Sequence, residues 1–331
     1  MPTCLIVQPI HEAGVKRLEE AGIATRWASA QDMATVAAEI GDADAVITRD
    51  AGLDRAAIDA AGKLVVIANH GIGTNKIDVA HATGLDIPIV YTPSANARSV
   101  AEHAVGMMLA LAKRFKAADA ATHAGNWRFK YSGGMSEISG KTLGLVGFGT
   151  IAKLVAAMAI GGFGMRVLVH SPMAPDADIE AAGATRADSL EALLAEADFV
   201  SLHRPMRPDT RHTLDAAAFA AMKPTAFVIN SARGALIDEV ALAEALQSGR
   251  IAGAGLDVFE TEPLPQDSPL LACDNTILAP HVAGSTEDAL RETALQCADQ
   301  IIEVLAGKKP PHLVNPDVWS RRRSGASLAS A

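Results

Sequence analysis

The chain has 331 residues and a formal charge of −9 at pH 7, with 49% hydrophobic and 20% charged side chains. This length and composition can bury the cores of two domains, which excludes disordered and fibrous classes. The acidic balance argues against a nucleic-acid partner, because phosphate binding needs clustered lysines and arginines. The basic run at residues 321–323 begins a serine- and alanine-rich end, residues 321–331, which we expect to be a frayed tail.

The spacing of the cysteines and the hydropathy of the chain indicate the cellular compartment of the protein. Cys4, Cys273 and Cys297 lie far apart, without a CxxC pair or metal-ligand spacing, so we predict no disulfide, no metal site and a reducing compartment. Residues 1–8 lack the basic start and apolar stretch of a signal peptide, and no run approaches the roughly 20 apolar residues of a membrane span. We expect a soluble, cytoplasmic protein without membrane contact.

In the first third of the chain, short apolar runs alternate with alanine-rich amphipathic stretches, which is typical of parallel strands joined by crossover helices. The predicted strands are residues 4–7, 45–48, 64–68 and 87–90, and the predicted helices are 11–21, 33–40 and 54–60. A long helix should follow from Ser99 to about residue 121, with Ser99 as N-cap and Glu102 as its capping-box partner. A glycine- and aromatic-rich arm at residues 125–134 comes next.

A second α/β series begins after this arm. Its predicted strands are residues 142–146, 166–170, 199–203, 226–230, 253–257 and 276–278. Six strands separated by helices predict a doubly wound sheet of the size that binds a dinucleotide. A closing helix at residues 286–305 is long enough to return to the first domain.

A glycine-rich turn follows the strand at residues 142–146. Gly147, Gly149 and Ala152 occupy the three positions of a GxGxxG motif that opens an alanine-rich helix. In this context the glycines let the backbone approach a pyrophosphate, which binds the unpaired amides of the helix start. The third position needs only a small residue for helix–strand packing. The motif therefore predicts a dinucleotide cofactor in preference to a tight turn without ligand.

The cofactor could be NAD or NADP. The acid that usually ends the second strand is missing, since residues 166–170 run into Ser171 and the next acid is Asp176. Such an acid would bond the ribose of NAD and repel the 2′-phosphate of NADP, whereas Ser171 does neither. Arg204, after the next strand, could pair with a 2′-phosphate or lie on the surface as a solvated cation. The pattern leans toward NADP and leaves both cofactors open.

Three segments in the last hundred residues place a chemically useful side chain just after an apolar strand, where open α/β sheets bind ligands. They are residues 230–234 with Arg233, 256–263 with Glu262 and 279–285 with His281. Taken singly, each has a structural explanation: a capping cation, a solvated loop acid and a structural histidine.

With these segments the chain resembles the D-isomer-specific 2-hydroxyacid dehydrogenase family, particularly its phosphoglycerate dehydrogenase-like and hydroxypyruvate reductase-like members. The likeness extends from about residue 40 to residue 317. Besides the three segments in the family's order, it includes residues 71–78 (GIGTNKID), 99–103 (SVAEH) and 144–149 (GLVGFG). This many motifs in register make the match specific.

The resemblance implies two doubly wound domains, with a Rossmann nucleotide-binding domain at residues 99–286 inserted into a flavodoxin-like substrate domain at 1–98 and 287–331. It also implies a homodimer built from the helix at Ser99 and the arm around Trp127. Asp257 matches the position that contacts the nicotinamide carboxamide, and Ile72 and Gly73 lie in the loop whose amides hold the substrate carboxylate. Arg49 matches an anion contact of phosphoglycerate dehydrogenases, although a surface salt bridge is the stronger explanation.

The candidate cofactor residues lie in the glycine-rich turn or just after the strands of the second series. They are Gly147, Phe148, Gly149, Thr150, Ile151, Ser171, His203, Arg204, Pro205, Thr210, Ser231, Ala232, Asp257, Ala283 and Gly284. The candidate substrate residues are Arg49, His70, Ile72, Gly73, Arg233 and His281, with Asn69, Ser94 and Trp127 as further pocket candidates.

Reduction of a 2-oxo acid needs a hydride, a proton for the new hydroxyl and a cation that holds the carboxylate. Arg233, always charged and bidentate, suits the carboxylate and the carbonyl oxygen. His281 suits the proton, because histidine titrates near neutral pH, and Glu262 would orient its ring and favour its charged form. The catalytic prediction is therefore Arg233, Glu262 and His281.

The predicted function is hydride transfer between NAD(P)H and a small 2-oxo acid, giving a D-2-hydroxy acid of the phosphoglycerate, hydroxypyruvate or glyoxylate type. The alternative is a non-catalytic NAD(H)-sensing binding protein of the same fold. We see no added domain or charged docking segment that would favour it. Formate or phosphite oxidation is a further enzymatic alternative, but formate enzymes pair their histidine with glutamine where this chain has Glu262.

Overall fold

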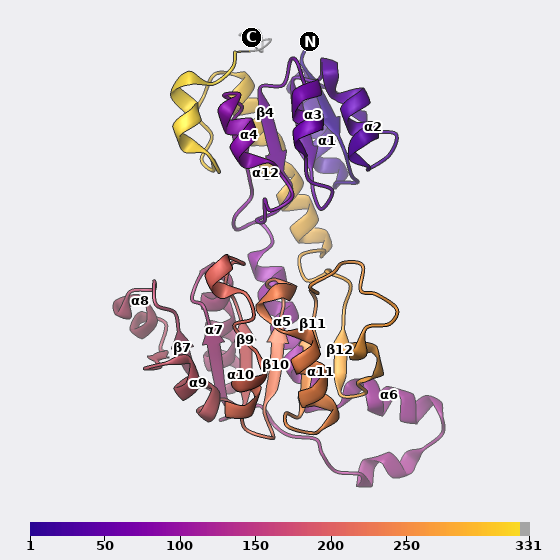
Figure 1. The fold of residues 1–331 in the computed structure, drawn as a ribbon, viewed down its shortest axis with the longest axis vertical. Coiled ribbons are helices and arrows are strands. Elements are labelled where there is room, and N and C mark those ends of the chain that lie inside the picture. Colours follow the sequence, from indigo (N-terminus) through magenta and orange to yellow (C-terminus); the bar gives the residue numbers. More distant parts are fainter. Residues whose placement is uncertain (325–331) are drawn as a thin grey trace. The chain divides into compact units, whose positions relative to one another are not determined.

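The structure is a computed structural model that describes residues 1–324 (Figure 1). The chain forms two compact units. One, the split domain, comprises Met1–Asn96 and the segment from Ser285, and the other, the inserted domain, is Ala97–Gly284. The chain thus changes domain after Asn96 and after Gly284, where the sequence predicted residues 98 and 286. The predicted α/β class with two parallel-sheet domains is confirmed.

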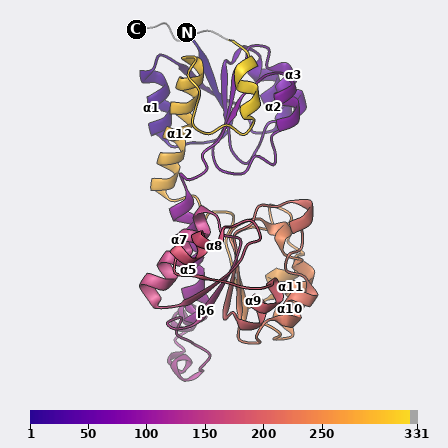
Figure 2. The ribbon, with the colours of Figure 1, turned by 90° about the vertical axis from the view of Figure 1, so that its left-hand side faces the viewer.

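The split domain contains a parallel sheet in the order β2-β1-β3-β4-β5, which is the flavodoxin-like order. Its strands are β1 (Thr3–Ile6), β2 (Ala24–Trp27), β3 (Ala45–Thr48), β4 (Val66–Asn69) and β5 (Ile89–Val90). Its helices are α1 (Glu12–Glu20), α2 (Met33–Glu39), α3 (Arg55–Ala60), α4 (Val79–Gly84) and α12 (Glu287–Leu305). Alternate residues of β1 point to opposite faces, so Leu5 packs with α2 and α3 while Ile6 packs with α1 and α12 (Figure 2).

The inserted domain contains a parallel sheet in the order β12-β11-β10-β9-β6-β7-β8. Its strands are β6 (Thr142–Val146), β7 (Arg166–His170), β8 (Thr185–Arg186), β9 (Phe199–Leu202), β10 (Phe227–Asn230), β11 (Gly253–Leu256) and β12 (Thr276–Leu278). The order reverses between β6 and β9, and such a switch point is where doubly wound sheets bind dinucleotides.

Helices cover both faces of this sheet, as Figure 2 shows for α5, α7 and α8 on one side and α9, α10 and α11 on the other. The helices are α5 (Ala97–Ala112), α6 (Phe115–His123), α7 (Thr150–Phe163), α8 (Asp176–Ala181), α9 (Leu190–Glu196), α10 (Ala216–Ala221) and α11 (Glu239–Gln247). The segment containing α6 projects from the body of the inserted domain (Figure 1).

The prediction of one long helix from Ser99 to residue 121 was wrong. The chain forms α5 and α6 instead, because Arg114 between them adopts the left-handed conformation with φ of +53°. Ser99 is not an N-cap. It lies buried inside α5, and its hydroxyl donates to the carbonyl of Ala283 at 2.5 Å. Glu102 is exposed and pairs with Arg98 at 3.7 Å.

Two short strands, β2 and β8, were missed by the sequence analysis. Both lie at the edge of a sheet, where one side of the strand has no neighbouring strand. Residues of β2 are half-buried or exposed, and β8 is only Thr185–Arg186. An edge strand that is half solvated need not carry an apolar run, so hydrophobic periodicity could not reveal these two.

The prediction of a frayed tail from residue 321 was wrong for residues 321–323, which make specific contacts. Arg321 pairs with Asp86 at 2.6 Å, and the guanidinium of Arg322 lies 3.8 Å from the ring centroid of Trp319. The backbone amide of Arg323 donates to the carbonyl of Asp86 at 3.0 Å. Residues 325–331 lie outside the described residues.

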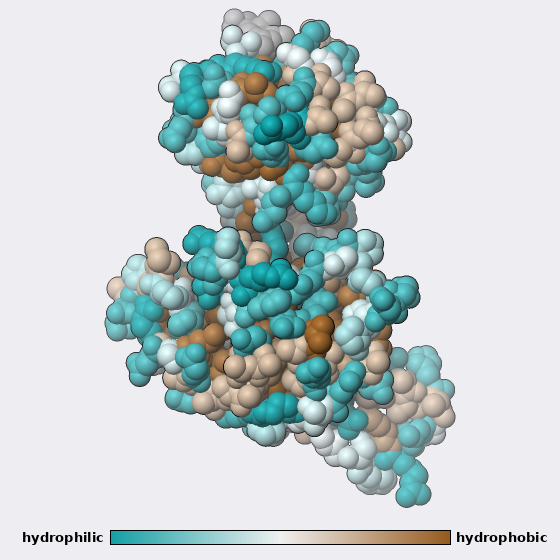
Figure 3. Space-filling view, viewed as in Figure 1, coloured by the Kyte–Doolittle hydropathy of each residue, from teal (hydrophilic) through white to brown (hydrophobic). Residues whose placement is uncertain are grey.

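No helix among residues 1–324 combines the length and apolar character needed to cross a bilayer. Figure 3 shows mostly hydrophilic or weakly apolar side chains on the face in view. The same range contains no group of three histidine, cysteine or acidic side chains placed to hold a metal ion.

A buried histidine follows β4 in the split domain. Burial, together with a smaller effect of the nearby cation of Arg49, lowers the pKa of His70 to about 4. The side chain of His70 therefore stays neutral in the folded protein throughout the physiological pH range.

This burial predicts a loss of stability in acid. Between pH 6.5 and 4 the unfolded chain takes up a proton at His70 that the folded chain resists, so the free energy of unfolding should fall by up to about 3 kcal/mol. The contribution is complete above pH 6.5. In His70→Gln, which does not titrate, urea denaturation at pH 7 and pH 4.5 should show a smaller fall.

The exposed His123 provides the control, because its side chain is 82% accessible. His123→Gln should keep the wild-type pH dependence. Equal acid sensitivity of the wild type and His70→Gln would contradict the assignment.

Candidate active site

The glycine-rich turn joins β6 to α7 at the switch point of the inserted domain's sheet. Gly147 has φ of +98°, and a Cβ there would lie 2.4 Å from the carbonyl oxygen of His203, so this position requires glycine. Gly149 is the N-cap of α7 and faces open space, and no side chain within the inserted domain caps the helix start. The fully buried Ala152 packs α7 on the sheet. These features fit a dinucleotide pyrophosphate.

Two cations, Arg186 and Arg204, lie near the end of β7. Ser171 follows the strand, and its carbonyl accepts from Nη1 of Arg186 at 2.9 Å. Arg186 also bonds the carbonyl of Ala174 and the carboxylate of Asp176. Burial lowers the pKa of His170, and the cations of Arg204 and Arg186 lower it further. Arg186 was missed by the sequence analysis, because the chain alone does not show that β8 lies beside β7.

The segment after β9 turns back on itself. The hydroxyl of Thr210 donates to the carbonyl of Pro205 at 2.9 Å and accepts from the amide of Arg207 at 2.7 Å. Thr210, predicted as a cofactor contact, thus holds this loop together. The ring of His203 bonds the hydroxyl of Ser201 at 2.9 Å, and burial lowers the His203 pKa to about 4.

The Arg233 loop is shaped by a residue that the sequence analysis did not single out. Asn230 is buried at the end of β10, where its amide nitrogen donates to the carbonyl of Arg233 at 2.9 Å and its amide oxygen accepts from Ala232 at 3.0 Å. Nη1 of Arg233 donates to the carbonyl of Ala232 at 2.6 Å. The hydroxyl of Ser231 is buried and has no hydrogen-bond partner among the described residues, which suits a ligand contact here.

Two of the three candidate catalytic loops, those of Arg233 and Glu262, pack closely through their backbones. A Cβ on Gly234 would lie 1.8 Å from the carbonyl carbon of Phe259, so only glycine allows this approach. The amide of Phe259 in turn donates to Oε1 of Glu262 at 3.1 Å. The position of Arg233 is thereby tied to that of Glu262.

His281 and Glu262 form a pair. Nδ1 of His281 lies 2.9 Å from Oε2 of Glu262, and the two side chains are 45% and 35% exposed. Because Glu262 engages Nδ1, the other ring nitrogen, Nε2, is left to act on a ligand. This is the arrangement that proton transfer by histidine requires.

Charged residues also hold the loop that contains Glu262, through contacts with Glu260. Glu260 pairs with Arg211 at 3.1 Å and with His212 at 2.5 Å. Its amide donates to Oε1 of Glu239 at 2.6 Å. Burial raises the pKa of Glu239, and the charges of Glu260 and Glu262 add to this rise.

Asp257 is fully buried at the end of β11, and it holds the His281 loop. Its two carboxylate oxygens accept from the amides of Val282 and Ala283, each at 2.8 Å. Its main-chain carbonyl accepts from the amide of His281, also at 2.8 Å. The structure thus assigns Asp257 a role in shaping the loop, besides the predicted contact with nicotinamide.

The predicted substrate residues of the split domain follow β3 and β4. The amide of Asn69 donates to the carbonyls of Gly71 and Gly73 at 2.9 and 3.2 Å, which folds the loop containing Ile72. Arg49 donates to the carbonyl of Pro9 at 2.9 Å. Arg49 takes part in no ion pair of residues 1–324, so the surface salt bridge suggested by the sequence is not formed.

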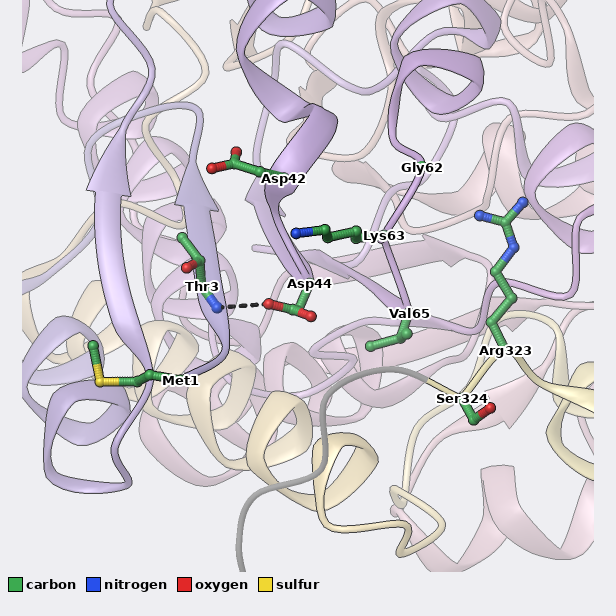
Figure 4. A pocket seen from close by; sticks show the side chains of 9 residues that line it. All are labelled: Met1, Thr3, Asp42, Asp44, Gly62, Lys63, Val65, Arg323 and Ser324. Carbon is green, nitrogen blue, oxygen red and sulfur yellow. Dashed lines mark hydrogen bonds between the residues drawn. The ribbon is translucent and has the colours of Figure 1, made fainter.

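A hollow of about 850 Å³ lies at the opposite, amino end of the split domain's strands (Figure 4). Its lining includes Thr3, Asp44, Lys63 and Arg323. The amide of Thr3 donates to Asp44 at 2.9 Å, so part of this polar lining is already satisfied. Open parallel sheets bind ligands at the carboxyl ends of their strands, and we therefore do not assign the active site here.

Comparisons with known proteins agree with this geometry. Residues 105–283 match the family described as D-isomer specific 2-hydroxyacid dehydrogenase, NAD binding domain. The chain is 35% identical over 330 residues to a glyoxylate reductase of Korarchaeum cryptofilum, covering 98% of this chain and 99% of that protein. It is 40% identical over 316 residues to D-3-phosphoglycerate dehydrogenase of Methanocaldococcus jannaschii, covering 95% of this chain but 60% of that protein. The chain spans about 60% of the length of the phosphoglycerate dehydrogenases it matches.

Solved structures give the same result. A Thermus thermophilus protein superimposes with a TM-score of 0.87 at 33% identity, covering 94% of this chain and 99% of that one. The NADPH-dependent glyoxylate/hydroxypyruvate reductase of Sinorhizobium meliloti, in complex with NADP and malonate, superimposes with a TM-score of 0.85 at 28% identity, covering 98% and 99%. These matches confirm the predicted cofactor as NAD or NADP, without distinguishing between the two. The chain belongs to the D-isomer specific 2-hydroxyacid dehydrogenase family.

Proposed function

We propose that the protein is an NAD(P)-dependent D-2-hydroxyacid dehydrogenase that interconverts a small 2-oxo acid and the corresponding D-2-hydroxy acid. The observation that carries this proposal is the His281–Glu262 pair at 2.9 Å, tied through the Gly234–Phe259 contact to the Arg233 loop. The pair and the loop follow strands of one dinucleotide-binding sheet. Relatives named glyoxylate reductase, hydroxypyruvate reductase and D-3-phosphoglycerate dehydrogenase support the substrate class.

Arg233, His281 and Glu262 each have a separate role in the proposed reaction. When bound, the nicotinamide supplies the hydride that is added to C2 of the 2-oxo acid. Arg233 holds the substrate carboxylate and polarises the carbonyl oxygen, for which the planar guanidinium is suited. His281 donates the proton from Nε2 to that oxygen, while Glu262 accepts from Nδ1–H and fixes the ring. In the reverse direction, His281 removes the hydroxyl proton.

In the split domain, the loop at residues 70–73 would supply amides for the substrate carboxylate. Arg49, free of ion pairs within residues 1–324, supports a substrate with a second anionic group. His70 would contribute as a neutral hydrogen-bonding group, since burial keeps its pKa at about 4. These roles remain predictions.

A substrate screen tests the function directly. Purified protein with NADH or NADPH should reduce at least one of glyoxylate, hydroxypyruvate, pyruvate, phosphohydroxypyruvate and sulfopyruvate. If the cofactor binds and none is reduced, the non-catalytic NAD(H)-sensing alternative replaces this proposal.

The screen leads to a prediction about Arg233. Arg233→Lys keeps the charge but loses the two-pronged geometry, so kcat/KM for the 2-oxo acid should fall about 100-fold or more with little change in cofactor affinity. Steady-state kinetics and fluorescence titration of the cofactor measure the two effects. Turnover near that of the wild type would remove Arg233 from its assigned role.

We also propose that the cofactor site favours NADP, because Ser171 replaces the usual acid and the cations of Arg186 and Arg204 lie near the end of β7. Ser171→Asp places a carboxylate near the expected 2′-phosphate and should raise the Kd for NADPH about tenfold or more while changing that for NADH little. Arg204→Ala should act in the same direction. Equal changes for both cofactors would contradict this preference.

We further propose a homodimer formed by α5 and the arm around Trp127. Every residue of α6, which the structure describes in full, is exposed or half-buried. Phe115, Trp127 and Tyr131 are 57%, 75% and 78% exposed, which is unusual for large apolar side chains in a monomer. The resemblance of the sequence to the family implies that the partner is a second copy of the chain.

Light scattering after gel filtration tests this assembly. The wild type should have twice the 34.3 kDa mass of the chain, and the double variant Trp127→Asp, Tyr131→Asp should shift toward the monomer mass. Trp27→Asp, a change at another exposed tryptophan, should leave the mass unchanged. A monomeric wild type would refute the dimer.

We also propose that the protein is located in the cytoplasm. Cys4, Cys273 and Cys297 all lie within the described residues, and each is buried with a free thiol. Burial raises the pKa of Cys4 to about 12, so its thiol is not readily ionised. Free thiols of this kind suit a reducing compartment.

A further inference from the structure

Helix α5 presents two polar side chains, one turn apart, toward the loop that carries His281. The hydroxyl of Ser99 donates to the carbonyl of Ala283 at 2.5 Å. Nε2 of His103 lies 3.7 Å from Oδ1 of Asp257. The next residues on this side of the helix, including Ala104 and Met107, are apolar and pack in the core. Packing alone does not explain a serine and a histidine at these positions.

The His103 contact bears on a buried charge. The Asp257 side chain is 1% exposed, and its oxygens already accept two backbone amides. Burying a carboxylate is unfavourable unless donors or an opposite charge compensate it. Nε2 of His103 is itself buried and has no hydrogen-bond partner among residues 1–324. The imidazole therefore lies beside the Asp257 carboxylate with a ring nitrogen that no other described residue engages.

The loop needs such support because of its backbone. His281 has φ of +54°, a left-handed conformation that is unfavourable for a residue other than glycine. Such conformations persist only where the surroundings hold them. Here Asp257 holds the amides of residues 281–283, and Ser99 holds the carbonyl of Ala283. Each of these contacts lies within the inserted domain.

We infer that Ser99 and His103 are positioning residues that hold the His281 loop, Ser99 directly and His103 through the Asp257 carboxylate. This inference rests on the proposed function for its effect on catalysis, but its structural part does not. In this arrangement α5 sets the direction in which His281 presents its proton. A small displacement of an acid–base group can slow the chemical step by up to about 100-fold.

Two substitutions of His103 separate its polar contact with Asp257 from its packing. His103→Leu removes the ring nitrogen and fills a similar space, whereas His103→Gln restores a nitrogen donor at a comparable reach. With catalysis normalised to cofactor-binding sites, His103→Leu should lower kcat tenfold or more and change KM for the 2-oxo acid less than about threefold. The deuterium isotope effect on kcat, measured with 4-deuterated NAD(P)H, should increase. His103→Gln and the parallel variant Ser99→Thr should recover most of the rate that His103→Leu and Ser99→Ala lose.

Hydrogen exchange provides a readout that does not depend on activity. The amides of Val282 and Ala283 should exchange about tenfold faster in His103→Leu than in the wild type, because the carboxylate that they bond is less well held. The control is His81→Leu, which removes an imidazole 2.6 Å from the carboxylate of Asp59 in the split domain. It should leave kcat, the isotope effect and the exchange of these amides unchanged.

The hydrogen-exchange readout separates a failure of this inference from a failure of the proposed function. If the wild type reduces no 2-oxo acid, the exchange rates alone decide whether His103 holds the loop. Exchange and isotope effect at wild-type values in His103→Leu would overturn the inference. A loss confined to thermal stability or to the number of cofactor-binding sites would overturn it equally.

Discussion

The buried carboxylate of Asp257 is the interaction on which the rest of the candidate site depends. It lies at the end of β11, and both oxygens accept amides from the loop after β12, while its own carbonyl accepts the amide of His281. Neighbouring strands of a parallel sheet end at the same edge, so one side chain there can fix the loop of the next strand. A charge withdrawn from water makes these bonds stronger and more directional than a neutral side chain could provide.

The remaining loops are fixed to this one by close contact. Gly234 packs on the backbone of Phe259, and Phe259 donates to Glu262, which in turn orients His281. Asn230 closes the loop before Arg233 with two hydrogen bonds of its amide. The three candidate catalytic residues therefore follow three different strands, and contacts between and within their loops fix their positions, which is the preorganisation that acid–base catalysis requires.

The end of β7 lacks the acid that usually follows the second strand of a dinucleotide-binding sheet. Ser171 leaves the end of β7 without the usual negative charge, and Arg186 reaches the same segment from β8. Arg186 uses its guanidinium to hold the carbonyls of Ser171 and Ala174, and it also pairs with the carboxylate of Asp176. The proposed preference for NADP rests on the cations of Arg204 and Arg186 near this segment as well as on the absence of the acid.

The sequence by itself determined the α/β class, most strands and the glycine-rich turn, because buried parallel strands and crossover helices have a strong hydrophobic period. It also selected Arg233, Glu262 and His281, which follow strands that the pattern marks. Only the tertiary structure decided what polar residues inside helices and edge strands contact: Ser99 bonds Ala283 and is no N-cap, His103 faces Asp257, and Arg186 reaches Ser171. These contacts join residues far apart in the chain, and local periodicity holds no information about such partners.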